Sequence, residues 1–351
     1  MNQIEHITYD CFLALLSISL LVLGLVLFLI CRKKPVESEE TLPPVVIKLC
    51  ATAYPLTDID TATDGFNNRR IIGQGRLGTV YAAALHDHQL VAVKRIYPGL
   101  VLSNAGFGFS SVIKTLSLAH HPNIVSILGF SQAPGERIIV SEFVNGMVSL
   151  DSYLHANQNN GVPSLLDWNQ RLRIAAGAAK GLEYLHEGVA PNVVHGCMKS
   201  SNVLIDEKFC ARVCDYGLSF LAPPQQKRGL VGYVDEEYWS GGGGGACKGS
   251  DVYGFGVVLL ELLSGRKCEE GLLVKWSLPL IKEMRISEVL DSRLVIPSDI
   301  KPLVRLAKVA LACVGNSRKN RPSIVQVSAI LNNLEINHQI QDQNRQELGK
   351  F

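Results

Sequence analysis

A glycine-rich loop and a lysine beyond it are the residues whose spacing most directly indicates chemistry. The loop consists of Ile72, Gly73, Gln74, Gly75, Arg76, Leu77, Gly78, Thr79 and Val80. Glycines let a backbone turn come close to phosphate groups and present N–H donors to them. Lys94 stands fourteen residues after Val80, in an apolar, strand-like stretch that also holds Ala92. Glycines alone also mark ordinary hairpins, but the loop and the lysine together predict a phosphate-binding site.

Asn202 and Asp215 form a second set of polar residues, thirteen positions apart. Asp215 opens an Asp-Tyr-Gly tripeptide, and Asn202 ends a run that begins at His195. Carboxylate and amide oxygens are ligands that Mg²⁺ takes beside nucleotide phosphates. Each residue by itself would also fit a turn or a polar surface. In this order after Lys94, they predict a metal site with Asp215 as its first ligand and Asn202 as a second.

Residues from about 54 to 335 resemble a protein kinase domain when these motifs are taken together. The segments GAAKGLEYLH, SSNVLIDE and SDVYGFGVVLLELLSGR are similar to those of the plant receptor-like kinases, which are relatives of Pelle. The resemblance implies ATP and Mg²⁺ as ligands. It also implies a small β-rich lobe followed by a larger helical lobe.

The resemblance assigns roles to residues outside these motifs as well. The segment from Glu142 to Val144 would be the hinge that meets adenine, and Leu204 would line the base pocket. Asp251 would brace the catalytic loop from a buried helix. Glu237 and Arg321 would form an ion pair in the large lobe.

Cys197 departs from the family pattern at the position that matters most for activity. The family's His-Arg-Asp reads His195-Gly196-Cys197 here. The missing aspartate accepts or orients the proton of the substrate hydroxyl, whereas a neutral thiol is a poor acceptor. Because general-base assistance is worth roughly 10²–10⁴ in rate, we expect phosphotransfer to be very slow or absent.

Further departures concern groups that support the same activity. Val112 stands where the family has the glutamate that pairs with Lys94, and no carboxylate occurs in residues 104–122. The family's Gly-Thr-x-Gly-Tyr has leucine in place of threonine at Leu230, and residues 220–239 hold no Ser or Thr. Gly196 removes the arginine that would bind a phosphorylated activation loop. The alternative is an unusual active kinase that tolerates every one of these changes.

Residues 11–31 form an uncharged stretch of the length that crosses a bilayer, for which about 20 apolar residues suffice. A buried core helix usually carries a polar stripe, and a cleaved signal peptide begins with basic residues, which the ten preceding positions lack. Arg32, Lys33 and Lys34 follow directly, so the positive-inside rule places the C-terminal side in the cytoplasm. These features predict a single-pass anchor.

The expected organisation has five parts: a short extracellular N-terminus (1–10), a transmembrane helix (11–31), a juxtamembrane linker (32–53), a kinase-like domain (54–335) and a polar C-terminal tail (336–351). Strand-like segments such as 90–96 and 136–144 precede helical ones such as 167–186 and 251–265. This order predicts an α+β fold with a β-rich N-lobe and a helical C-lobe.

Composition excludes several classes of protein. With 34 Lys+Arg against 32 Asp+Glu, the formal charge of +2 provides no footprint for nucleic acid. An apolar fraction of 47% is too high for a disordered chain. Seven of the nine cysteines fall on the predicted cytoplasmic side, where thiols stay reduced, so no disulfide framework is expected.

The sequence therefore predicts a membrane-anchored, catalytically inactive receptor-like kinase homologue that binds ATP. It would act as a signalling scaffold or as an allosteric partner of an active kinase, with another receptor-like kinase or receptor as its protein partner. The predicted location is the plasma membrane, with the N-terminus outside. Two alternatives remain open: a weakly active kinase that transfers the ATP γ-phosphate to Ser and Thr hydroxyls, and a structural adaptor that binds no nucleotide.

Overall fold

The chain divides into two compact units, Met1–Ile47 and Lys48–Phe351. The computed structural model describes residues 15–25, 51–85, 89–102, 108–146, 148–155, 165–222, 229–239 and 245–348, with backbone only for 337–348. In the first unit the described residues 15–25 are helical. The fold and the site described below belong to the second unit.

The predicted fold class included a transmembrane helix over residues 11–31, and this part of the prediction is wrong. Within the described residues, no helix is both long and apolar enough to cross a membrane. Residues 11–14 and 26–31 of the predicted span lie outside the described residues, as do the predicted N-terminus and most of the predicted linker.

A six-stranded sheet forms the small lobe, with the strand order β1-β5-β6-β4-β3-β2. Its strands are β1 (Thr52–Ala53), β2 (Ile71–Gln74), β3 (Gly78–Ala84), β4 (Leu90–Ile96), β5 (Ile127–Ala133) and β6 (Glu136–Glu142). Neighbouring strands are antiparallel except β1, which runs parallel to β5 at the edge of the sheet. The helices of this lobe are α2 (Leu56–Ala62), α3 (Pro98–Leu102) and α4 (Phe109–Leu116).

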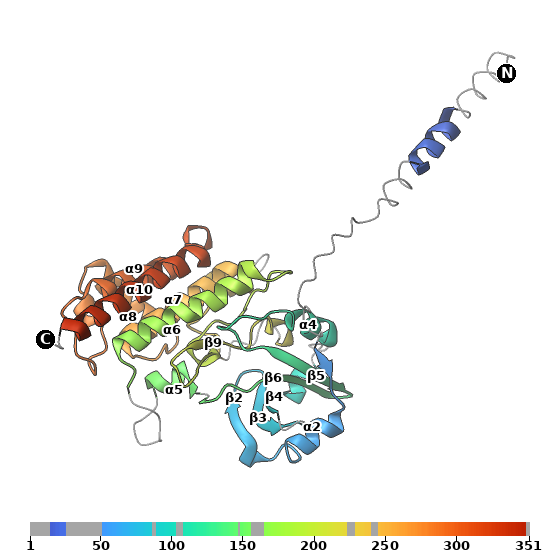
Figure 1. The fold of residues 1–351 in the computed structure, drawn as a ribbon, viewed down its shortest axis with the longest axis horizontal. Coiled ribbons are helices and arrows are strands. Elements are labelled where there is room, and N and C mark those ends of the chain that lie inside the picture. The colour runs from blue at the N-terminus through green and yellow to red at the C-terminus, as the bar shows by residue number, and fades with distance from the viewer. Residues whose placement is uncertain are drawn as a thin grey trace. The chain divides into compact units, whose positions relative to one another are not determined.

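Strand β4 shows how the sheet positions Lys94. Side chains alternate between the two faces of a strand. Val91 and Val93 are fully buried in a cluster with Ile59 of α2, on the face that α2 covers in Figure 1. Ala92 and Lys94 therefore point to the opposite face, which meets the helical lobe. The predicted strand over 90–96 is confirmed, and its pattern directs the lysine toward the space between the lobes.

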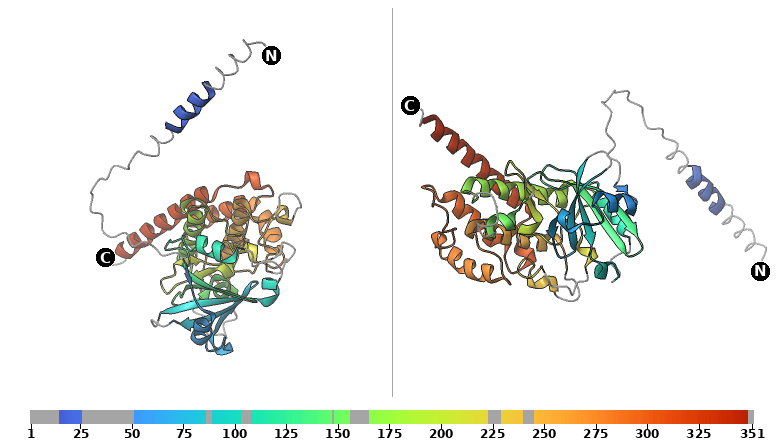
Figure 2. Two further views of the ribbon diagram at one scale, coloured as in Figure 1. Left: turned by 90° about the vertical axis from the view of Figure 1, so that its right-hand side faces the viewer. Right: turned by 90° about the horizontal axis from the view of Figure 1, so that it is seen from below.

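The helical lobe follows in the chain, and Figure 2 shows its green to red helices on one side of the blue to cyan sheet. Its helices are α5 (Leu150–His155), α6 (Trp168–Glu183), α7 (Lys248–Ser264), α8 (Leu272–Lys282), α9 (Lys301–Cys313) and α10 (Ile324–Leu348). A three-stranded sheet of β7 (Val148–Ser149), β8 (Val203–Ile205) and β9 (Ala211–Val213) faces the small lobe. The predicted fold of a β-rich lobe and a helical lobe is confirmed.

Local sequence explains where the two central helices begin and end. Asp167 accepts a hydrogen bond from the backbone N–H of Gln170, and the Gln170 side-chain oxygen in turn accepts one from the Asp167 N–H, which forms a capping box at the start of α6. Helix α7 ends at Gly265, whose positive φ of 64° suits glycine and closes the last turn. Nearly every residue of α7 is buried, so this helix forms the centre of the lobe.

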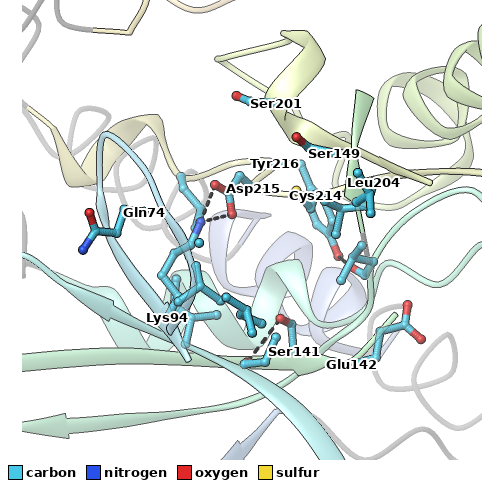
Figure 3. A pocket seen from close by; sticks show the side chains of 18 of the residues that line it. Gln74, Lys94, Ser141, Glu142, Ser149, Ser201, Leu204, Cys214, Asp215 and Tyr216 are labelled. Atoms are coloured by element: carbon cyan, nitrogen blue, oxygen red, sulfur yellow. Dashed lines mark hydrogen bonds and ion pairs between the residues drawn. The ribbon is translucent and has the colours of Figure 1, made fainter. Parts of the chain in front are cut away.

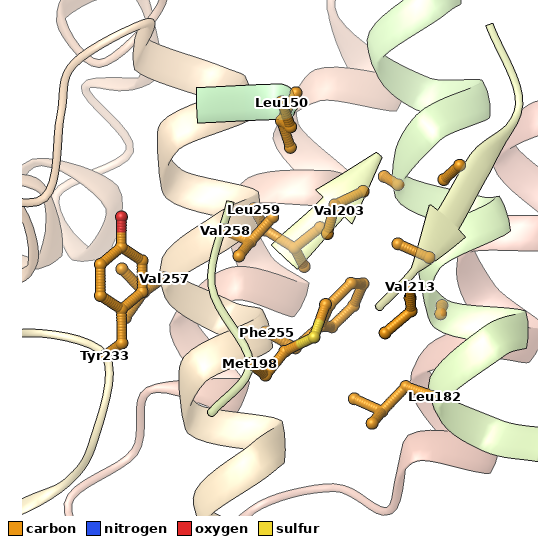
Figure 4. Close-up of a cluster of buried hydrophobic side chains, with 14 of the residues drawn as sticks. Leu150, Leu182, Met198, Val203, Val213, Tyr233, Phe255, Val257, Val258 and Leu259 are labelled. Carbon is orange, nitrogen blue, oxygen red and sulfur yellow. The ribbon is translucent and has the colours of Figure 1, made fainter. Parts of the chain in front are cut away.

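The core of the helical lobe also anchors the loop before β8. In Figure 4, Met198 from this loop points at Phe255 of α7, and both side chains are almost completely buried. Leu182 of α6 lies on the other side of the same cluster. Packing of Met198 therefore holds its neighbour Cys197 at a defined depth between the lobes.

A buried ion pair joins α6 to the chain after α8, and it predicts acid sensitivity. The Arg171 guanidinium is fully buried and donates to Asp291 at 2.6 Å, and Arg293 donates to the same carboxylate at 2.8 Å. Burial alone would raise the pKa of Asp291, but the two arginines lower it to about 2. In the unfolded chain this pKa is about 3.9. The stabilising contribution of the carboxylate is therefore complete above pH 4 and is lost as the pH falls toward 2.

We expect the free energy of unfolding to fall between pH 4 and pH 2 more steeply in the wild type than in Asp291→Asn, since the variant has no carboxylate to protonate. Denaturant unfolding at pH 5, 4, 3 and 2 would measure both slopes. Equal slopes in this window would contradict the assignment.

Candidate functional site

Two adjacent cavities lie where the sheet lobe meets the helical lobe. The larger has a volume of about 600 Å³ and lies between strands β2 to β6 and residues from α5, β8 and the segment 214–218 (Figure 3). The smaller has a volume of about 40 Å³ and lies under the glycine-rich loop. Ser201, Asp215 and Leu218 line both cavities, so the two spaces are neighbours.

The structure divides the predicted site residues between these cavities. The larger cavity is lined by Ile72, Gly73, Gln74, Val80, Ala92, Lys94, Glu142, Leu204 and Asp215. The smaller is lined by Gly75, Arg76, Leu77, Asn202 and Asp215. Gly78, Thr79 and Val144 line neither of them, and all three are buried. The residues predicted for one nucleotide site thus come together around one cleft, apart from these three.

Lys94 makes an ion pair with Asp215, and Figure 3 shows the ammonium group facing both carboxylate oxygens. Burial would raise the pKa of Asp215, but the charge of Lys94 lowers it, so the carboxyl group is ionised. Val112, where the family has a glutamate, lies on α4 and lines a separate cavity of about 290 Å³ with Val193 and Gly217. Lys94 therefore takes the predicted metal ligand as its partner.

The loop that carries Cys197 is held from below by one carboxylate. Asp251 of α7 accepts hydrogen bonds from the backbone N–H groups of His195 and Gly196, at 2.7 and 2.8 Å. The predicted bracing role of Asp251 is confirmed. Gly196 has a positive φ of 81°, a conformation that disfavours any larger residue.

Cys197 itself is nearly buried in this loop and is neutral. Burial raises the pKa of its thiol, while the nearby Lys199 and Arg76 oppose that rise. The Asn202 amide donates to the Cys197 carbonyl at 2.9 Å, so the residue is fixed in place. The smaller cavity opens beside it. Asp215, already paired with Lys94, is the one acidic residue among the lining residues described for this cavity.

The predicted Mg²⁺ site is tested by the state of its two ligands. Asp215 and Asn202 line the same small cavity and supply a carboxylate and an amide, which suit Mg²⁺. Both oxygens of Asp215 are engaged by Lys94, however. The residues therefore fit the metal only once Lys94 has moved to another anion, such as a nucleotide phosphate.

The predicted ion pair between Glu237 and Arg321 is wrong. Arg321 pairs instead with Asp235, whose carboxylate also accepts from Arg318 at 2.7 Å. All three side chains are largely buried, whereas Glu237 is 48% exposed and lies 3.9 Å from the Arg318 guanidinium. The acid that takes the buried position stands two residues earlier in the chain than predicted.

Several lining residues of the larger cavity were not predicted, among them Ile139, Ser141, Cys214 and Tyr216. The strand pattern could have identified the first two. Val140 is buried on the face of the sheet that α2 covers, so its neighbours Ile139 and Ser141 point to the other face. Cys214 precedes Asp215 directly, and its position follows from that of Asp215. Tyr216 donates to the Val125 carbonyl at 2.9 Å, which no local pattern indicates.

Comparison with known proteins identifies this arrangement. The family model "Protein tyrosine and serine/threonine kinase" matches residues 66–331. The serine/threonine-protein kinase-like protein CCR2 of Arabidopsis thaliana is 34% identical over 304 residues, covering 85% of this chain and 36% of CCR2. Phytosulfokine receptor 1 of the same plant is 37% identical over 293 residues, covering 79% of this chain and 28% of the receptor. The chain thus spans about a third of the length of these curated relatives.

A solved structure has the same fold at similar identity. The pseudokinase domain of BIR2, described as an immune regulator of the RLK/Pelle family, superposes with a TM-score of 0.67 at 33% identity. The match covers 84% of this chain and 94% of that domain. The predicted resemblance to the receptor-like kinases is confirmed, and the chain belongs to the RLK/Pelle family of protein kinases.

Proposed function

We propose that the chain is a catalytically inactive member of this family, a pseudokinase. The observation that carries the proposal is the neutral, nearly buried thiol of Cys197 at the position of the catalytic aspartate. In the small cavity beside it, Asp215 is held by Lys94, so no free carboxylate among the described lining residues is placed to accept a hydroxyl proton. The geometry supports binding of a phosphate donor and acceptor more than transfer between them.

Nucleotide binding is the second part of the proposal. The 600 Å³ cavity has the size of a small-molecule site and is lined by apolar groups such as Ala92 and Leu204 beside the charged pair Lys94 and Asp215. A nucleotide phosphate would take Lys94 away from Asp215 and leave that carboxylate next to the phosphates. Mg²⁺ would supply the positive charge that Asp215 then needs, so metal and nucleotide binding should be coupled.

Thermal unfolding of the full chain tests nucleotide binding. We expect ATP to raise the melting temperature by several degrees with Mg²⁺ and by less with EDTA, because only the metal offsets the negative charge of Asp215 once Lys94 has moved to the phosphates. Binding at a concentration 100 times Kd adds about 2.7 kcal/mol to the free energy of unfolding. Lys94→Met, which removes the phosphate-binding cation, should abolish the shift. If millimolar ATP leaves the melting temperature unchanged, the chain is an adaptor that binds no nucleotide.

Inactivity is tested separately, with a generic Ser/Thr substrate and labelled ATP. We expect no phosphotransfer above that of Lys94→Met. Transfer by the wild type that Lys94→Met abolishes would overturn the proposal in favour of a weakly active kinase.

Signalling through protein contacts is the third part of the proposal. The relatives include a receptor and a pseudokinase domain described as an immune regulator, which supports a role beside an active receptor-like kinase. The chain would act there as a scaffold or as an allosteric partner. Such a partner would also bring it to the plasma membrane, where receptors act.

A further inference from the structure

A histidine and two carboxylates gather where helix α5 meets the central helix α7. Asp151 and His155 lie one turn apart on α5, and Glu261 comes from the last turn of α7. One oxygen or nitrogen atom of each residue lies within 4.8 Å of the corresponding atoms of the other two. The His155 side chain is 9% exposed and Glu261 is fully buried, whereas Asp151 is 29% exposed and also lines the 600 Å³ cavity. The cluster is thus closed at Glu261 and borders the cavity at Asp151.

Two polar atoms of this cluster are buried without a hydrogen-bond partner among the described residues. They are the Nε2 of His155 and the Oε2 of Glu261. Leaving a buried polar atom unpaired costs about 1–3 kcal/mol, and more for a charged group. The other oxygen of Glu261 is already used, since it accepts from the Tyr233 hydroxyl at 2.6 Å and from the Cys268 N–H at 3.2 Å. Each of the two unpaired atoms therefore keeps its capacity for a further ligand.

Asp151 sets the tautomer of His155. Its Oδ1 lies 3.1 Å from the Nδ1 of the ring. This hydrogen bond lowers the pKa of Asp151 against the effect of burial, and the charges of Lys267 and Lys199 lower it further. An ionised carboxylate can only accept a hydrogen bond, so Nδ1 carries the proton and Nε2 of the neutral ring keeps a lone pair. The lone pair on Nε2 and the oxygen of Glu261 are donors that a metal ion takes.

We propose that His155 and Glu261 bind a divalent transition-metal ion such as Zn²⁺, with Asp151 orienting the imidazole. Zinc binds histidine nitrogen and carboxylate oxygen at about 2.0–2.2 Å, so two of its ligand atoms lie about 3.4 Å apart. The cluster is slightly wider than this, and small side-chain rotations would close it around the ion. A carboxylate behind a metal-binding histidine is the usual arrangement, because it fixes the tautomer and raises the basicity of the ring. Water from the cavity that Asp151 lines would fill the remaining coordination positions.

The charges of the cluster suit such an ion. Asp151 and Glu261 carry one negative charge each when ionised, and a divalent ion neutralises both, so the loaded cluster adds no net charge near Lys199 and Lys267. Mg²⁺ and Ca²⁺ suit it less, because they prefer oxygen ligands to imidazole. The bound ion would tie α5 to α7 and, through the hydrogen bond of Glu261, to Tyr233. The site needs no nucleotide, so it stands apart from the proposed function.

Calorimetric titration of the metal-free full chain with Zn²⁺ tests the inference. We expect a saturable site that binds one ion per chain. His155→Gln and Glu261→Gln should each weaken it at least about tenfold, because each removes a ligand. Asp151→Asn should weaken it by about 10–100-fold, the range for a residue that orients a metal ligand. His120→Gln changes an exposed histidine elsewhere and should leave the affinity unchanged. Thermal unfolding without metal would show that each variant is folded.

Nitrogen-15 NMR of the histidine rings identifies the atom that binds. One equivalent of Zn²⁺ should shift the Nε2 resonance of His155 and leave Nδ1 protonated. In Asp151→Asn the ring should no longer hold one tautomer, which a residue that only supports the fold would not change. A Zn²⁺ shift at Nδ1 in place of Nε2 would contradict the assigned roles.

Two outcomes of the titration would overturn the inference. Absence of saturable binding, or equal affinity in His155→Gln, would mean that water satisfies the two unpaired atoms. Zn²⁺ binding that Asp215→Asn abolishes and His155→Gln leaves intact would place the ion in the nucleotide cleft. We expect the reverse, with Asp215→Asn binding Zn²⁺ as the wild type does.

Discussion

Replacing Cys197 with aspartate should raise phosphotransfer by about 10²–10⁴, the range that a general base contributes. The loop around position 197 is already held in place by contacts that the substitution does not alter. The Asp251 carboxylate holds the loop through two backbone N–H groups, the Asn202 amide fixes the Cys197 carbonyl, and Met198 is packed in the core. The new carboxylate would lie beside Arg76 and Lys199, which lower its desolvation cost. Only the missing acceptor for the hydroxyl proton would have been added.

Labelled ATP and a generic Ser/Thr substrate would measure the gain, with Cys197→Asn as the control of equal shape and no charge. The control should remain inactive. Thermal unfolding of both variants would show that each is folded. If Cys197→Asp is folded and as inactive as the control, then another departure limits the reaction, and Val112→Glu, which restores the family's second missing carboxylate, should be added.

The second large effect concerns the stability of the helical lobe. We expect Asp235→Asn to lower the free energy of unfolding by about 3–5 kcal/mol, because Arg321 would remain buried without its partner. The Asp235 side chain is 3% exposed and the Arg321 side chain 1%, so water cannot replace the lost carboxylate. A second arginine, Arg318, would lose the same partner.

Glu237→Gln is the matched control, since it makes the same chemical change two residues away. Glu237 is 48% exposed, and surface substitutions of this kind stay within about 0.5 kcal/mol. Denaturant unfolding of both variants beside the wild type would compare them. A larger loss of unfolding free energy in Glu237→Gln than in Asp235→Asn would support the ion pair between Glu237 and Arg321 that the sequence predicted.

Short, local motifs were the features that the sequence predicted well. The glycine-rich loop, Lys94 and Asp215 come to one cleft because each belongs to a strand or turn whose position the fold determines. The same reasoning gave no sign that Lys94 and Asp215 pair with each other, since 121 residues separate them and the pairing depends on how the lobes meet. Composition and residue spacing also failed to predict the positive charge of Arg76 and Lys199 beside Cys197. Arg76 was counted only as part of a loop, because the cavity that it shares with Lys199 exists only in the folded chain.

The ion pair of Asp235 and the membrane span show two other reasons for error. Position in a motif identified the region of the acid, but burial chose between Asp235 and Glu237, and burial is a property of the packed lobe. The span was predicted from an apolar run of 21 residues, whereas no helix among the described residues is long and apolar enough to cross a membrane. Apolar composition favours removal of a segment from water, and it does not by itself specify the structure that the segment adopts.

The two-residue strand β1 has a consequence for how the molecule behaves among its own copies. It lies parallel to β5 at the rim of the sheet, where Tyr54 donates its backbone N–H to the Phe130 carbonyl at 2.8 Å. The Ala51 N–H donates to the Ser117 hydroxyl at 3.0 Å and holds the same segment against the lobe. Without this strip, the outer hydrogen-bonding groups of β5 would be open to a strand from another chain, which is how sheets aggregate. By pairing with Gly129 and Phe130, β1 occupies part of this edge and limits the access of other strands to it.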